Sequence, residues 1–339
     1  MMKTTLLSTT QPDLEKAGHI LAAGGLVAIP TETVYGLAAN ALDEDAVREI
    51  FRAKGRPQDN PLIVHICELG MLKDLVSEIP PKLYELAERF WPGPLTIILP
   101  KSDKIPKATS GGLDTVAIRF PSDETARQII KEAGVPLAAP SANLSGSPSP
   151  TTAQHCIDDL TGRVDAIVCG KDCKVGVEST VLSLAVSPPR LLRPGAVTFE
   201  ALKEILPDLV MDDAVTHQLK PGAVASSPGM KYKHYAPKAQ VTLLDGPFEK
   251  FRAYVKEHKA EKTFALVFEG EEASLPVPCI TYGQESDSLS QAHTLFQALR
   301  RLDEMGAQTV FARMPAQSGV GLAVYNRLIR AAAFHVIKL

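Results

Sequence analysis

The chain has 339 residues, of which 45% are apolar and 22% charged, and its formal net charge is −3. This composition is that of a soluble globular protein, and the length suits about two domains that each bury a core of their own. The absence of a long apolar run excludes a membrane span, and the slightly negative charge means that a nucleotide or RNA site needs a local cluster of basic residues.

Short apolar runs alternate with helical patterns over about the first 205 residues, which predicts a mixed α/β sheet domain. Asp43 is suited to cap a helix whose apolar face is formed by Val47, Ile50 and Phe51. In chain order, the expected elements are a strand at 25–29, a helix at 43–53, a strand at 62–66, a helix at 80–90, strands at 95–99 and 115–120, helices at 123–133 and 151–160, a strand at 164–168, and a hairpin formed by 181–184 and 190–192.

Residues 207–240 differ in composition, because four prolines with glycines and serines between them punctuate the segment. This composition predicts an extended linker. The segment also contains the sequence SPGMKYKHYAP at 227–237, whose lysines, tyrosines and histidine are a rich mixture for an inert tether. A solvated tether and a functional loop both stay open.

From residue 241 onward, strand and helix patterns alternate cleanly, which predicts a smaller, Rossmann-like parallel sheet with helices on both faces. The expected elements are a strand at 241–244, a helix at 247–258, a strand at 263–268, a helix at 292–305, a strand at 309–312 and a helix at 322–334. We therefore predict a catalytic domain at 1–206, a linker at 207–240 and a C-terminal α/β domain at 241–339.

The strongest cationic cluster is Lys54 and Arg56, on a loop between a predicted helix and a predicted strand. Gly55 and Pro57 stiffen this loop, and a lysine point charge beside a planar arginine fork suits a polyphosphate. The same charges are also favourable at a helix C-terminus, so a purely structural role stays open. His65, inside the next strand, is either a packed core residue or a ligand-binding one.

Two polar loops follow predicted strands, where α/β proteins bind their ligands. Residues 31–37 offer hydroxyl groups and Gly36, which lets a ligand approach the backbone closely. Residues 141–149 offer serine and asparagine side chains and backbone N–H groups that could hold phosphate or ribose. Ordinary turns have the same composition. Arg119 and Arg193 each end an apolar strand and need an anionic partner, which is either a protein carboxylate or a substrate.

Several familiar motifs are absent from the sequence. It contains no P-loop, no G-x-G-x-x-G after a strand and no nucleophile elbow. The five cysteines form no C-x-x-C pair, and Cys169 and Cys173 lack the further ligands of a zinc site. A reducing cytosol therefore suits this chain better than a disulfide framework.

Taken together, these stretches resemble the YrdC-type threonylcarbamoyl-AMP synthases in their longer, two-domain form. The matching motifs are PTETVYGL at 30–37, KGRP at 54–57, NPL at 60–62, PGPLT at 92–96, PSAN at 140–143, STV at 179–181 and RPG at 193–195. The lysine-x-arginine and serine-x-asparagine pair is highly specific in this order. The polar linker and the C-terminal α/β domain extend the resemblance over nearly the whole chain.

The resemblance implies a twisted mixed-sheet domain and a cytoplasmic enzyme that forms threonylcarbamoyl-AMP and pyrophosphate from L-threonine, bicarbonate or CO2, and ATP. A separate transferase complex would then modify adenosine in tRNA, while tRNA binding by this chain stays open. The residues implied for ATP are Lys54, Arg56, Asn60, Thr115, Ser141, Asn143, Ser149, Arg193 and Tyr235, and those for threonine are Thr33, His65, Arg119 and Ser179. Mg²⁺ is expected to be carried by the ATP phosphates, without a dedicated protein site.

The polar linker suggests a lid. We expect Lys231, His234 and Tyr235 to face the nucleotide and to shield a labile mixed anhydride from water. Two other functions stay open: an RNA-binding module without turnover, and a carbamoyltransferase that uses carbamoyl phosphate and shares this domain. The net charge disfavours the first, and the lack of zinc-finger and acylphosphatase-like segments disfavours the second.

Overall fold

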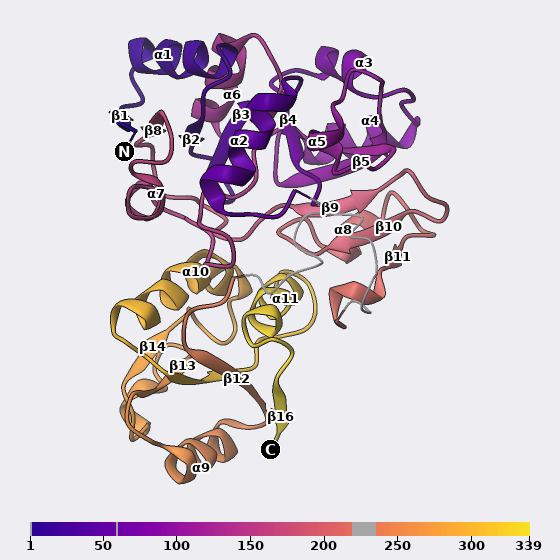
Figure 1. The fold of residues 1–339 in the computed structure, drawn as a ribbon. Helices are drawn as coiled ribbons and strands as arrows, with labels where there is room; N and C mark the ends of the chain where they lie inside the picture. Colours follow the sequence, from indigo (N-terminus) through magenta and orange to yellow (C-terminus); the bar gives the residue numbers. More distant parts are fainter. Residues whose placement is uncertain (1, 59, 219–234) are drawn as a thin grey trace.

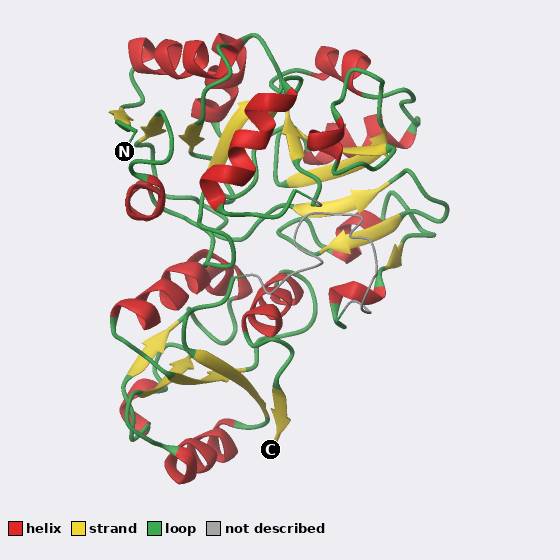
Figure 2. Ribbon diagram, in the orientation of Figure 1, coloured by secondary structure: helices red, strands yellow, loops and turns green. Residues whose placement is uncertain are grey.

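The computed structural model describes residues 2–58, 60–218 and 235–339. In these ranges the chain forms two α/β units, each built around its own sheet (Figure 1). Helices pack against both sheets, and loops of the larger unit lie between its sheet and the smaller unit (Figure 2). No helix in the described ranges is both long enough and apolar enough to cross a lipid bilayer.

The larger unit contains a mixed sheet that has eleven strands within the described residues. Parallel pairs such as β4 with β6 stand beside antiparallel pairs such as β5 with β6, which confirms the predicted mixed sheet. Across the sheet the strands are β1 (Thr5–Leu7), β8 (Ala166–Val168), β2 (Val27–Ile29), β3 (Gly36–Asn40), β7 (Leu137–Ala138), β4 (Ile63–His65), β6 (Thr115–Arg119), β5 (Leu95–Pro100), β9 (Thr180–Ser183), β10 (Arg190–Arg193) and β11 (Val210–Met211).

Helices cover the larger sheet on both faces, because alternate strand residues point into different cores. Val27 and Ile29 pack with residues of α1 and α6, whereas Ala28 packs with residues of α2, α4 and α7. The helices of this unit are α1 (Gln11–Ala22), α2 (Glu44–Lys54), α3 (Leu72–Leu75), α4 (Lys82–Phe90), α5 (Lys107–Ser110), α6 (Glu124–Ala133), α7 (Ala153–Leu160) and α8 (Phe199–Lys203), with short 3-10 turns η1 (Leu69–Met71) and η2 (Asp213–Val215).

Helix α2 begins where its sequence predicts and ends at Lys54, one residue beyond the expected range of 43–53. The Asp43 side chain accepts hydrogen bonds from the backbone N–H groups of Asp45 and Ala46, which confirms Asp43 as the N-cap. Gly55 stops the helix in the left-handed region, at φ 62°. The cap geometry makes Lys54 the last helical residue and directs the following loop toward the sheet.

The smaller unit is a parallel sheet, as predicted. Across it the strands are β14 (Cys279–Thr281), β13 (Thr263–Val267), β15 (Thr309–Arg313), β12 (Gln240–Asp245) and β16 (Val336–Lys338). Its helices are α9 (Phe248–His258), α10 (Ser288–Glu304) and α11 (Gly321–Ala331), with the 3-10 turn η3 (Glu272–Ser274). Figure 1 shows α10 and α11 on the face toward the larger unit and α9 on the opposite face.

The predicted linker differs from the structure at its N-terminal end. Strand β11 pairs in parallel with β10 through Arg190 and Val210, so this part of 207–240 joins the larger sheet. A strand of two residues carries too short a pattern to be recognised from sequence. Lys231 and His234 lie outside the described residues, and the lid therefore stays a prediction.

Candidate functional site

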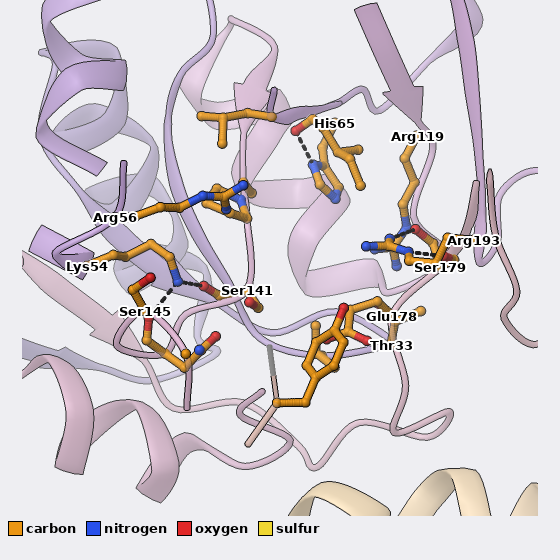
Figure 3. A pocket seen from close by; sticks show the side chains of 18 residues that line it. Thr33, Lys54, Arg56, His65, Arg119, Ser141, Ser145, Glu178, Ser179 and Arg193 are labelled. Atoms are coloured by element: carbon orange, nitrogen blue, oxygen red, sulfur yellow. Dashed lines mark hydrogen bonds between the residues drawn. The ribbon is translucent and has the colours of Figure 1, made fainter. Parts of the chain in front are cut away.

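A pocket in the larger unit brings four basic side chains from three chain segments together. Lys54 and Arg56 come from the end of α2, Arg119 from the end of β6 and Arg193 from the end of β10. Figure 3 shows the first two on one side of the pocket and the last two on the opposite side. Among the described lining residues, Glu178 is the only carboxylate. The pocket is therefore suited to an anionic ligand that spans both sides.

Most of the predicted site residues line this pocket, namely Thr33, Lys54, Arg56, His65, Arg119, Ser141, Asn143, Ser179, Arg193 and Tyr235. Three others do not line it. Ser149 lies behind the wall, where its hydroxyl donates to Glu178 Oε1. Thr115 begins β6, about 13 Å before Arg119 along the strand. Asn60 is buried, and its side-chain amide has no hydrogen-bond partner among the described residues. The binding roles of these three stay predictions.

Lys54 connects the end of α2 to the loop after β7. Its Nζ donates to the backbone oxygens of Ser141 and Asn143, and its own carbonyl oxygen accepts from Ser145 N at 2.9 Å. Burial, together with the charge of Arg56, lowers the pKa of Lys54 to about 7. A polyanion bound beside Lys54 would raise that pKa again, because it favours the charged form.

Arg119 has a protein carboxylate as one partner. Its Nη2 lies 2.9 Å from Glu32 Oε1, and the two side chains are only 5% and 7% exposed. Burial opposes ionisation of Glu32, but the Arg119 guanidinium outweighs it and holds the pKa of Glu32 below its usual value. We assigned no role to Glu32 from the sequence, where the available signal was the need of a strand-end arginine for an anion.

Arg193 lies on the same wall as Ser179. Its Nε donates to Ser179 O at 2.9 Å and its Nη2 to Ser179 Oγ at 3.1 Å. Thr96 Oγ1 lies 2.7 Å from the same hydroxyl, so Ser179 is fixed from both sides. The structure thus joins a residue predicted to bind ATP to one predicted to bind threonine.

His65 offers a neutral acceptor to the pocket. Its Nδ1 lies 3.2 Å from Ile63 O, which can only accept, so we assign the proton to Nδ1 and the acceptor role to Nε2. Burial, with the charge of the neighbouring Arg119, lowers the pKa of His65 to about 3. The imidazole is therefore uncharged over the physiological range.

We expect the free energy of unfolding to fall as the pH drops from 6.5 toward 4, with His65 contributing at most about 1.4 kcal/mol per pH unit. The sign follows because the unfolded chain protonates His65 in this range and the folded chain does not. Denaturant titrations at several pH values measure the slope. The His65→Gln variant should show a shallower slope, since His155, whose pKa is lowered to about 4, contributes equally to both proteins. Equal slopes would contradict the neutral assignment.

The pocket is also lined by two polar residues that were not among the predicted ATP- and threonine-binding residues, and by Tyr235 at its edge. Ser145 lines the pocket, and it belongs to the polar loop 141–149, which the sequence suggests for phosphate or ribose. Glu178 lines it as well, without a predicted role; it directly precedes the STV motif at 179–181. Tyr235, the first described residue after 218, is buried at φ 64°, and its ring lies 5.3 Å from that of Phe296 in α10. The smaller unit therefore forms part of the pocket's surroundings.

Comparisons with known proteins cover the whole chain. Residues 19–195 match the Sua5–YciO–YrdC family model, described as "Telomere recombination", and residues 197–333 match the model "Threonylcarbamoyl-AMP synthase, C-terminal domain". Proteins named threonylcarbamoyl-AMP synthase from Pyrococcus abyssi and Bacillus subtilis are both 44% identical to it; the alignments cover 95% and 99% of this chain, and 95% and 97% of those proteins. The crystal structure of P. abyssi Sua5 complexed with L-threonine matches with a TM-score of 0.91 at 41% identity, covering 100% of this chain and 99% of that one.

Proposed function

The chain belongs to the Sua5–YciO–YrdC family, and we propose that it is a threonylcarbamoyl-AMP synthase, which makes threonylcarbamoyl-AMP and pyrophosphate from L-threonine, bicarbonate or CO2, and ATP. The 44% identity to two enzymes of this name over nearly their full length supports the proposal. The observation that carries it is the pocket with basic side chains on two opposite sides, because the reaction brings a triphosphate and an amino-acid carboxylate together.

In this proposal, ATP lies on the side of Lys54 and Arg56, with Ser141 and Asn143 as polar neighbours. A buried ammonium group and a guanidinium fork are complementary to phosphate oxygens. ATP would enter as its magnesium complex. Both carboxylate oxygens of Glu178 are already hydrogen-bonded, so the phosphates and water would supply most ligands of the ion.

Threonine lies on the opposite side. Arg119 is suited to its carboxylate, and His65 Nε2 to a donor such as the threonine hydroxyl or amine. The hydroxyls of Thr33 and Ser179 would complete this part of the site. Arg193, bonded to Ser179, would then lie next to the phosphate that reacts with the amino acid derivative.

The chemistry requires placement and charge neutralisation more than a strong base. The threonine amine adds to CO2 and loses a proton, which gives a carbamate. A carbamate oxygen then bonds to the α-phosphorus of ATP, and the bond from that phosphorus to the pyrophosphate breaks. Basic side chains around the triphosphate would stabilise the charge that moves onto the departing pyrophosphate.

Pyrophosphate release tests the proposal. Purified protein incubated with ATP, Mg²⁺, L-threonine and bicarbonate should release pyrophosphate, and omission of either threonine or bicarbonate should stop it. Release that is indifferent to both would refute the proposal. Salt-sensitive RNA binding without any turnover would instead favour an RNA-binding module.

The lability of the product indicates that a second enzyme must use it soon after it forms. A mixed anhydride of a carbamic acid and AMP is labile in water, so we propose that a separate transferase consumes it to modify adenosine in tRNA. The five cysteines are unpaired, which is compatible with the cytoplasmic location that we propose for this reaction.

A further inference from the structure

Arg327 of α11, in the smaller unit, is fully buried and contacts the larger unit beside the pocket. Figure 1 shows α11 on the face of the smaller unit that turns toward the larger one. Arg327 Nε donates to Glu178 Oε2 at 2.9 Å, its Nη2 to Glu178 O at 3.2 Å, and its Nη1 to Pro194 O at 2.8 Å. One guanidinium thus binds two separate segments of the larger unit.

Both of these segments carry residues that line the pocket. Glu178 precedes Ser179, Pro194 follows Arg193, and Arg193 is hydrogen-bonded to Ser179. The two segments are therefore joined twice, by Arg193 with Ser179 and by Arg327 with Glu178 and Pro194. These contacts fix the two segments relative to each other. Its Cζ also lies 5.7 Å from the centre of the Tyr235 ring.

The ion pair between Arg327 and Glu178 also neutralises a negative charge in the pocket wall. Glu178 is the only carboxylate among the described lining residues, and it faces a site that we expect to hold a triphosphate. Ser149 donates to one of its oxygens, and Arg327 supplies the neutralising charge at the other. Without Arg327, a buried negative charge would stand beside an anionic substrate, and low local polarity makes such repulsion strong.

Docking of the two units does not depend on this pair alone. Arg300 of α10 lies 2.8 Å from Asp159 and donates to Pro148 O at 2.7 Å, and Asn326 donates to Val215 O at 2.6 Å. A buried ion pair is often no more stabilising than apolar residues of similar size, so interface stability gives little reason for an arginine at this position.

We propose that Arg327 is a positioning residue for synthesis of the adenylate, by which the C-terminal unit completes the site: it neutralises Glu178 and holds the segments of Ser179 and Arg193 in register. This inference rests on the proposed function. In this inference the C-terminal unit assists the reaction indirectly, through Glu178 and not through a contact with substrate.

The test uses the full-length protein and threonine-dependent pyrophosphate release. Arg327→Met should lower kcat/KM for ATP by about 30-fold or more, because it leaves Glu178 unpaired. Adding Glu178→Gln to this variant should restore about tenfold of that loss, since the uncompensated charge is gone while the amide oxygen still accepts from Ser149. Arg327→Lys, which keeps the charge but not the fork, should fall between Arg327→Met and the wild type.

The matched control is Arg313→Met, which removes another buried arginine of the same unit, one that pairs with Glu271 and Glu285 at 2.9 Å and does not line the pocket. Its kcat/KM should stay within about twofold of wild type. Melting temperatures of all variants report folding. If Arg327→Met does not fold, Arg327→Lys and the double variant carry the test.

Wild-type kcat/KM in folded Arg327→Met would overturn the inference. So would a double variant no more active than Arg327→Met, or an equal loss in the Arg313→Met control, because each would reduce Arg327 to a packing role. A wild-type protein without threonine-dependent release would instead overturn the proposed function itself, and the inference with it.

Discussion

Replacing Arg119 with methionine should raise the KM for L-threonine by about a hundredfold, equivalent to about 2.7 kcal/mol of binding free energy. The substitution removes the guanidinium that we place on the threonine carboxylate. It also leaves Glu32, 2.9 Å from that guanidinium, as an unpaired buried carboxylate that repels the amino acid. Steady-state pyrophosphate release at varied threonine, together with calorimetric titration of L-threonine, measures the effect.

The control for this variant is Arg190→Met, the same substitution at the first residue of β10, where the side chain is 46% exposed and pairs with Asp212. Its KM for threonine should not change. Breaking the buried pair of Arg119 also costs stability, about 3–5 kcal/mol, so the folded fraction is measured beside the kinetics. A folded Arg119→Met protein with unchanged threonine affinity would remove Arg119 from the threonine site.

Replacing Lys54 with methionine should lower kcat/KM for ATP by at least about a hundredfold. The substitution removes a charge from the phosphate side, and it leaves the carbonyl oxygens of Ser141 and Asn143 without their shared donor. Arg52→Met is the matched control, because Arg52 lies on the same helix and its side chain is 70% exposed. It should stay within about twofold of wild type.

The lowered pKa of Lys54 adds a second readout. At pH 8 a pKa of about 7 leaves the free side chain mostly neutral, and a bound triphosphate raises that pKa, so ATP binding should take up protons. Calorimetry in buffers of different ionisation enthalpy measures the number of protons. Equal uptake by wild type and Lys54→Met, or none by either, would contradict a phosphate contact by Lys54.

Local sequence patterns predicted helix α2, which positions Lys54 and Arg56 on the proposed phosphate side of the pocket. Asp43 caps α2, as predicted, because a capping signal depends on only a few neighbouring residues. The parallel sheet of the smaller unit also followed from alternating strand and helix patterns, because each element there has a clear period.

Elements with weak local signals were missed. Helix α1 contains Gly18, which lowers helix propensity but lets α1 approach α6 closely; a Cβ at this position would lie 2.6 Å from Glu132 Cβ. Strand β3 has the sequence GLAAN, in which Gly and Ala are poor strand formers. Its residues are buried on both faces, so no polar–apolar alternation marks it.

The ion pairs that set the charge of the pocket could not be predicted from the sequence. Arg327 and Glu178 lie 149 positions apart, and Arg119 and Glu32 come from different strand ends. A single sequence shows that a buried arginine needs an anion, but only the folded chain shows which one. The motifs therefore indicated most of the pocket's lining, while its charge balance required the structure.

In the proposed reaction, the carbon of bicarbonate comes to lie between threonine and AMP. Reaction of the protein with ATP, L-threonine and isotopically labelled bicarbonate, followed by rapid mass spectrometry, tests it most directly. We expect a threonylcarbamoyl-AMP species that is heavier by the mass of one labelled carbon and that disappears when threonine is omitted. An adenylate without the label, or no adenylate at all while ATP is consumed, would contradict it.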